Sequence, residues 1–365
     1  NICCEIRFTL DMPLKFIEYG LIAFAFLLPW QTRLILKQGE FNGAPWEYGS
    51  FSIYGTEVLL WIILALSISV IARPRFGGTE VIPSLLPLTT GLLRRSFRLC
   101  RNSLLAMTLV ALLVCGSLST IWSPSPIIAF RAWLALVEGI SLFWLLVRIP
   151  LPTRHILYGF IAGMAVQASL GIYQFFTQSA FASTFLGMAF HDPGALGTSV
   201  VETISGRFLR AYGALPHPNI LAGYLVVAII LILYFSARGG SALGGRLPIL
   251  GLIKSKIKNQ FILFSIFYFL FSIFTAALFF TFSRGAWLAV ALTLIIMLIY
   301  DFFANLRIAN KISIFLYFYI SIFLVFAFWQ PFSARMLGQG RLETASLTER
   351  ASSLEQALEI ISEHP

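Results

Sequence analysis

The chain of 365 residues is 58% hydrophobic and 12% charged, with a mean hydropathy of +0.84. Soluble domains are roughly 45–50% apolar and about 25% charged, so this composition excludes an ordinary soluble protein. The net charge of +10 is better explained by loops facing anionic lipid than by nucleic acid, since no basic run is interleaved with aromatics. No disulfide framework or metal-ligand spacing links the four cysteines, Cys3, Cys4, Cys100 and Cys115.

Apolar runs of roughly 20 residues recur along the whole chain, and each is long enough to cross a bilayer as a helix. We therefore expect an all-α polytopic membrane protein with about nine transmembrane helices, in a bundle over residues 14–330. Residues 1–13 precede the bundle, and Met12 fits a native start. The predicted spans are residues 14–30, 51–72, 104–122, 127–147, 156–177, 218–236, 261–282, 286–303 and 312–330.

Basic residues concentrate on alternate loops, for example within residues 73–101 and 238–258. The positive-inside rule makes these loops cytoplasmic and places the N-terminus on the same side. Odd-numbered spans then run outward, and the segment after Gln330 lies outside the cell.

The segment 331–365 is predicted to begin a large extracytoplasmic loop that the chain truncates at Pro365. Its first part, 331–345, has the composition of a polar linker. Ser346 and Glu349 then stand at capping-box spacing and open an amphipathic helix. The apolar stripe of this helix is Leu347, Ala351, Leu354, Leu358 and Ile361.

Three arginines lie at the predicted outer ends of spans, where positive charge is unusual: Arg131, Arg210 and Arg284. An arginine inside the membrane costs about 2.5–3.5 kcal/mol on insertion scales and normally faces protein or a water-filled cavity. Guanidinium groups bind phosphate oxygens bidentately, so together they predict a cationic pocket for a diphosphate. For Arg131 an ion pair with Glu138 or Glu57 is an equal alternative.

The motif "LPHPN" opens the sixth predicted span. Pro216 and Pro218 delay the helix, which starts either with Asn219 as its side-chain cap or with Pro218 as its first residue. Either start leaves free N–H groups and a positive dipole end that suit an anion. His217 could contact a ligand or carry a proton, but a histidine satisfied by the backbone is the preferred interpretation.

Other polar residues near this end have plainer explanations. His191 and Asp192, in "FHDPG", are typical of a turn rather than an acid–base pair. For Gln174 and Gln178, solvation at the interface is preferred over lining a pocket. Arg207 is interpreted as an ordinary loop residue.

"RAYGALPHPNILAGYL", followed after one loop and one span by "FTFSRGAWLAVAL", resembles the O-antigen ligase and O-antigen polymerase family of bacterial membrane glycan transferases. The resemblance covers residues 122–365, and "LEQALEIISEHP" resembles a helix of the family's large outer loop. It implies about twelve spans in the bacterial cytoplasmic membrane and an active face outside the cell. It also implies a polyprenyl-diphosphate-linked glycan donor and, as acceptor, a growing glycan or lipid A core.

The resemblance further implies that Arg210 and Arg284 bind the donor diphosphate and that neither metal nor cofactor takes part. The chemistry would be that of an inverting glycosyltransferase. The family's catalytic histidine lies in an "HN" motif, expected beyond Pro365, so no catalytic residue is assigned. Further candidates for the pocket are Arg131, His217, Asn219 and Ser283.

Two other functions remain open. A transporter or flippase of lipid-linked glycan would also need outer arginines, but should carry ionisable groups near the membrane midplane. A non-catalytic scaffold of envelope assembly would tolerate alanine at these arginines.

Overall fold

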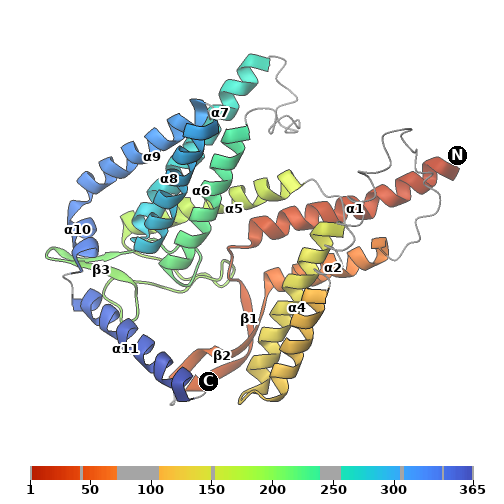
Figure 1. The fold of residues 1–365 in the computed structure, drawn as a ribbon, viewed down its shortest axis with the longest axis horizontal. Coiled ribbons are helices and arrows are strands. Elements are labelled where there is room, and N and C mark those ends of the chain that lie inside the picture. Colours follow the sequence, from red (N-terminus) through yellow and green to blue (C-terminus); the bar gives the residue numbers. More distant parts are fainter. Residues whose placement is uncertain are drawn as a thin grey trace. The chain divides into compact units, whose positions relative to one another are not determined.

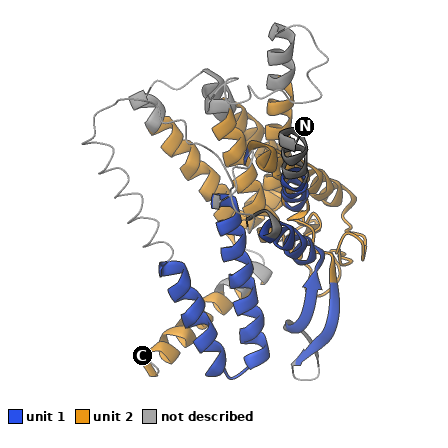
Figure 2. Ribbon diagram, turned by 90° about the vertical axis from the view of Figure 1, so that its right-hand side faces the viewer, with its two compact units in different colours: residues 1–24, 34–153 blue, residues 25–33, 154–365 orange. Residues whose placement is uncertain are grey.

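The computed structural model describes residues 2–41, 44–71, 107–148, 153–238, 256–304, 308–338 and 341–363. These residues are mostly helical (Figure 1), so the expectation of a helical membrane protein is confirmed at this level. The chain forms two compact units (Figure 2). Unit 1 comprises residues 1–24 and 34–153, and unit 2 comprises residues 25–33 and 154–365.

Within the described residues, three helical segments are long and apolar enough to cross a membrane individually: Pro126–Val147, Thr153–Thr177 and Pro218–Phe235. A fourth crossing is possible if Phe315–Ala327 and Trp329–Leu337, which meet at 95°, form one broken span. Shorter apolar helical segments are Gly55–Ile68, Met107–Ile121, Ser265–Phe280 and Arg284–Ile299. The count of nine spans and their orientation therefore stay predictions.

Unit 1 contains a β-hairpin where the sequence predicted a loop and the start of a span. The second span was expected from residue 51, but the strand continues to Tyr54 and the helix starts at Gly55. The segment "FSIY" is rich in aromatic and β-branched residues, which favour an extended strand. The elements are α1 (Ile2–Leu27, shared with unit 2), β1 (Arg33–Phe41), β2 (Ala44–Tyr54), α2 (Gly55–Ile71), a helix over 107–121 and α4 (Pro126–Arg148).

Helix α1 runs through residue 13, where the N-terminal segment was predicted to end. The division of the chain into an N-terminal segment, a bundle and an outer loop stays a prediction.

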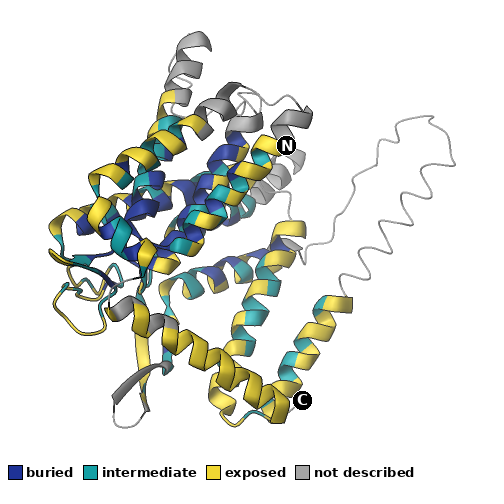
Figure 3. Cartoon of the chain, turned by 60° about the vertical axis from the view of Figure 1, so that its left-hand side comes forward, coloured by how far each residue is buried: buried dark blue, intermediate teal, exposed yellow. Residues whose placement is uncertain are grey.

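Unit 2 is a helical bundle around α6, which packs against α7, α8 and α9. Residues of α6 on several sides are fully buried, including Leu221, Leu225 and Ile229. Figure 3 shows buried residues gathered in this bundle. The elements are α5 (Thr153–Thr177), β3 (Val200–Thr203), β4 (Gly206–Leu209), α6 (Pro218–Arg238), α7 (Lys256–Phe280), α8 (Arg284–Ala304) and α9 (Ile308–Ala327).

The predicted linker 331–345 is wrong, because most of it is helical. Helix α10 (Trp329–Leu337) ends at Gly338, whose left-handed φ of 63° is a common helix stop. Helix α11 (Arg341–Glu363) follows, so the predicted capping box lies inside a helix rather than at its start. The expected amphipathic helix does form, and its stripe residues Leu354, Leu358 and Ile361 are exposed.

Candidate functional site

The loop that carries Arg210 is held by buried glutamines of α5. Gln174 Oε1 accepts the N–H groups of Tyr212 (3.1 Å) and Gly213 (2.8 Å), and its Nε2 donates to Gly213 O (2.8 Å). Gln167 accepts a further main-chain N–H of the same turn at 2.7 Å. Both glutamines are fully buried. Gln174 was predicted to be solvated at the interface, and this prediction is wrong. Its side-chain amide is buried and forms hydrogen bonds with the loop backbone that water would otherwise form.

The same turn requires a glycine. Gly213 has φ +63°, and a Cβ at this position would lie 2.6 Å from Gln167 Oε1. Backbone strain and a clash would both penalise a larger residue. At the start of the loop, Gln178 Oε1 accepts the N–H of Leu209 at 2.7 Å, so Gln178 is also structural. These contacts fix the position from which Arg210 extends.

Arg210 is a buried guanidinium, 4% exposed, at the junction of three helices. Its Nε donates to Thr281 O at 2.7 Å, in the turn between α7 and α8. Its Nη2 donates to Asn219 Oδ1 at 2.6 Å, in the first turn of α6. Among the residues that the structure describes, no carboxylate lies within ion-pair distance of Arg210. Neutral acceptors orient the group, and its charge remains uncompensated.

A second buried arginine, Arg335 of α10, approaches the same turn. Its Nε donates to Phe282 O at 2.9 Å. Arg284, the first residue of α8, lies beside it, with Nη1 3.4 Å from Arg335 O. Phe282 is fully buried with φ +48°, an uncommon conformation for a bulky residue. Two successive carbonyls of this strained turn thus accept hydrogen bonds from two arginines, Thr281 O from Arg210 and Phe282 O from Arg335.

Sequence reasoning missed Arg335, because it assigned the residue to a linker. Aromatic packing fixes the helix that carries it: Phe332 stacks on Phe279 and on Trp287, with ring centroids 6.1 and 5.7 Å apart. Phe328, just before α10, packs edge-on against Phe280 at 5.1 Å. An arginine in an aromatic-rich segment directly after the last predicted span was the available signal.

The electrostatics of the site are strongly positive. Burial, and then the charges of Arg335, Arg284 and Arg350, lower the pKa of Arg210 to about 9, so the group is still protonated at neutral pH. Burial and the charges of Arg210, Arg335 and Arg350 lower the pKa of His217 to about 4, which makes its ring neutral. The N-terminal ends of α6 and α8 add positive dipole ends.

His217 is satisfied within the loop, as the preferred interpretation held. Its Nδ1 accepts the N–H of Asn219 at 3.1 Å, so the proton of the neutral ring lies on Nε2, 3.0 Å from Ser199 Oγ. Pro218 is the first residue of α6. The alternative in which the Asn219 side chain caps the helix is wrong, because its Oδ1 accepts from Arg210.

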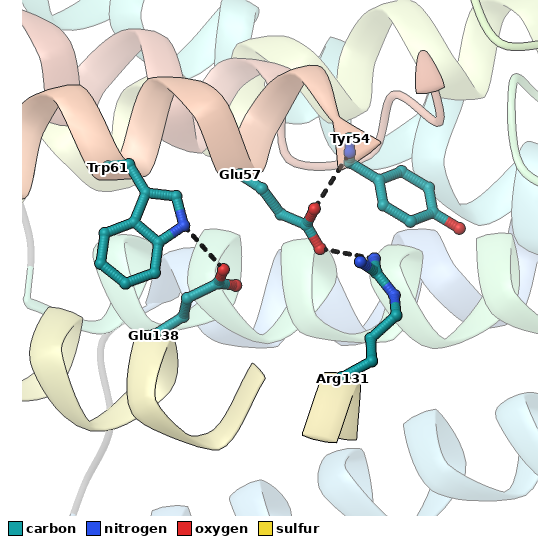
Figure 4. Close-up of polar contacts among 5 residues, drawn as sticks. All are labelled: Tyr54, Glu57, Trp61, Arg131 and Glu138. Atoms are coloured by element: carbon teal, nitrogen blue, oxygen red, sulfur yellow. Dashed lines mark hydrogen bonds and ion pairs between the residues drawn. The ribbon is translucent and has the colours of Figure 1, made fainter. Parts of the chain in front are cut away.

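Arg131 belongs to unit 1 and forms an ion pair with a carboxylate of that unit. Its Nη2 lies 2.9 Å from Glu57 Oε1 (Figure 4), so Glu57 is the partner rather than Glu138. Ser283 in unit 2 is buried beside Arg284, and its carbonyl accepts the N–H of Trp287. The structure thus brings together Arg210, Arg284, Asn219, His217 and Ser283, and adds Arg335.

A groove of about 390 Å³ lies among α7, α8, α9 and α10. Arg284 is the charged side chain of its lining, which is otherwise mainly apolar and aromatic. The aromatic and sulfur-containing residues that line it are Phe279, Trp287, Tyr317, Phe318, Phe332 and Met336. Arg284 therefore lies beside a mainly apolar groove.

The remaining polar residues follow their expected roles only in part. Asp192 Oδ1 accepts the N–H of Gly194 at 2.8 Å, which confirms a turn. The ring of His191 stacks on Tyr212 at 4.1 Å, and burial lowers its pKa. The interpretation of Arg207 as an ordinary loop residue was wrong, because Arg207 lies in strand β4 opposite Glu202 of β3 and forms an ion pair with it at 3.0 Å.

No protein-family model matches the chain, and comparison with curated proteins and with solved structures finds no significant match.

Proposed function

We propose that Arg210, Arg284 and Arg335 bind the diphosphate of a polyprenyl-diphosphate-linked glycan, with the prenyl chain in the groove beside Arg284. One observation carries this proposal: Arg210 is a buried, protonated guanidinium with no carboxylate partner in the described chain. A buried charge is costly unless something compensates it. A diphosphate supplies that compensation, and an apolar groove beside Arg284 suits the tail of the same molecule.

The proposed reaction is transfer of the glycan to an acceptor hydroxyl, as in O-antigen ligases and polymerases. The bond between the anomeric carbon and the diphosphate oxygen breaks, and negative charge grows on the leaving diphosphate. Fixed guanidinium groups stabilise that charge in the transition state. The acceptor oxygen attacks the opposite face of the anomeric carbon, with inversion, and its proton passes to a general base.

His217 is not proposed as this base, since its Nδ1 already accepts the N–H of Asn219 and its Nε2 carries the proton. The acceptor is a growing glycan or a lipid A core, reached from the extracytoplasmic face of the bacterial cytoplasmic membrane. The family resemblance implies a histidine of an "HN" motif as the base, and none of the residues that the structure describes is proposed for that role.

The test follows the fate of a labelled polyprenyl-diphosphate oligosaccharide incubated with the full-length protein and a glycan acceptor. Glycan transfer releases free polyprenyl diphosphate and yields a lengthened acceptor. Arg284→Ala should abolish both products, and the matched variant Arg207→Gln, which alters an arginine already paired with Glu202, should not. Equal product from Arg284→Ala and wild type would refute the proposed role of the cluster, and no product from either would favour a scaffold.

Transport of a lipid-linked glycan is a second candidate, supported by Glu138. This carboxyl group lies near the middle of α4, where a transporter is expected to carry an ionisable residue. A transporter would move the labelled donor between the leaflets of a vesicle and leave its glycan–diphosphate bond intact. The same labelled donor therefore separates the two candidates.

A further inference from the structure

Unit 1 contains a second polar site that glycan transfer does not use. Figure 4 shows Glu57 and Trp61 of α2 facing Arg131 and Glu138 of α4. Glu138 lies twelve residues from Pro126 and ten from Arg148, the ends of α4. At 1.5 Å per residue the carboxyl group is about 15–18 Å from either end of the helix.

The charges of this site do not balance. Arg131 is neutralised by Glu57 at 2.9 Å, and its guanidinium also lies 5.6 Å from the ring centroid of Phe51. Glu138 Oε1 accepts only a neutral donor, Trp61 Nε1–H, at 2.9 Å. In the described part of the chain Glu138 has no ion pair. Two carboxylates and one guanidinium leave a net charge of −1 when all are ionised.

These groups line a groove of about 540 Å³ between α2 and α4. Pockets of roughly 300–1,000 Å³ hold small organic ligands. The rest of the lining is apolar and includes Ile62, Leu134 and Ala135. The groove therefore offers one excess carboxylate and an indole within apolar walls.

We propose that this groove binds a lipophilic monocation, an apolar or aromatic body with an ammonium or phosphonium centre. Glu138 would compensate the charge of the ligand, and Trp61 would contact it through its indole ring. An anion is disfavoured, because Glu57 already neutralises the only guanidinium of the lining. A neutral ligand would leave the net charge of −1, present when all three groups are ionised, without a counter-ion in an apolar setting. The inference does not depend on the glycan-transfer proposal.

The test measures binding of tetraphenylphosphonium to the purified full-length protein in detergent. Tetraphenylborate, an anion of nearly the same shape, is the control ligand for simple partitioning. Wild type should bind the phosphonium saturably, and any borate bound beside Arg284 of unit 2 should be unaffected by Glu138→Gln. Glu138→Gln keeps an oxygen for Trp61 Nε1–H and removes only the charge, so phosphonium affinity should fall by about tenfold to a hundredfold. Glu355→Gln, on exposed α11, should bind like wild type.

A second variant keeps the test decisive if Glu138→Gln does not fold, as judged by thermal unfolding. Ala135→Phe fills the groove and leaves both carboxylates in place, so it should also abolish saturable binding. The proposal is overturned if wild type shows no saturable phosphonium binding, if Glu138→Gln weakens binding of tetraphenylborate as much as that of the phosphonium, or if either groove variant keeps wild-type affinity for the phosphonium.

Discussion

Arg210 in unit 2 and Arg131 in unit 1 were predicted to serve one pocket, but the structure gives them opposite surroundings. Arg131 is ion-paired with Glu57, and the side chains of the pair are 27% and 23% exposed. Arg210 is 4% exposed and donates to a main-chain carbonyl and an amide oxygen instead. A charge with neutral acceptors attracts a counter-ion, whereas an ion-paired charge does not.

The difference also underlies the opposite charges of the ligands proposed for the two units. In unit 2, Arg335, Arg284 and Arg350 all add positive charge around Arg210. In the groove between α2 and α4 of unit 1, two carboxylates accompany one guanidinium, so the spare charge is that of Glu138. The same residue type, arginine, thus belongs to the proposed anion site of one unit and to the proposed cation site of the other.

Removing the charge of Arg210 should have the largest effect. Arg210→Gln is expected to lower the affinity for undecaprenyl diphosphate by about a hundredfold or more, because the ligand loses a desolvated partner. Equilibrium binding to the full-length protein measures this. Arg210→Lys keeps the charge but not the planar fork, and should lose about tenfold. If Arg210→Gln kept wild-type affinity for undecaprenyl diphosphate, Arg210 would differ no more than Arg131 from an arginine without a role in binding the diphosphate.

The residue missed by sequence reasoning gives the next largest effect. Arg335→Gln should weaken binding of undecaprenyl diphosphate by about tenfold, since Arg284 and Arg210 remain. Arg207→Gln is the matched control, because it removes an arginine whose charge Glu202 already neutralises. Equal losses in the two variants would mean that general positive charge, rather than this cluster, attracts the ligand.

The burial of His217, together with the positive charges around it, should also appear as a pH dependence of stability. Folding lowers the pKa of His217 from its ordinary value of 6.5 to about 4. The unfolded state therefore binds the proton more tightly, and this contribution to stability is present above pH 6.5 and lost as the pH falls toward 4. Thermal unfolding should show the margin of wild type over His217→Asn shrinking across this interval. If the stability margin of wild type over His217→Asn grew at low pH, the pKa of His217 would not be lowered by folding.

The smallest effect is expected in unit 1. The Glu57–Arg131 pair is partly exposed, so a double-mutant cycle of Glu57→Gln and Arg131→Met should give a coupling of about 0.2–1 kcal/mol. Neither change should alter the affinity for undecaprenyl diphosphate. A large loss of that affinity in Arg131→Met would show that Arg131 serves the diphosphate after all.

The sequence predicted the long helices well, because an apolar run must form its own hydrogen bonds in lipid. The spans 127–147 and 218–236 compare with Pro126–Arg148 and Pro218–Arg238. It did not predict the hairpin ending at Tyr54, since hydropathy does not report strand pairing.

The site was predicted in part. Arg210, His217 and Arg284 stand out because charge and proline interrupt apolar runs. The role of Arg335 depends on a carbonyl 53 residues away, and that of Gln174 on a turn 39 residues away. Such contacts exist only after the helices pack, so local patterns do not show them.

The most direct measurement is an experimental structure of the full-length protein with undecaprenyl diphosphate. Donor binding in unit 2 predicts diphosphate oxygens about 2.7–2.9 Å from guanidinium nitrogens of Arg210, Arg284 or Arg335. It also predicts the prenyl chain in the groove lined by Phe279 and Tyr317. Diphosphate density beside Arg131, or a ligand that contacts none of the three arginines, would contradict it.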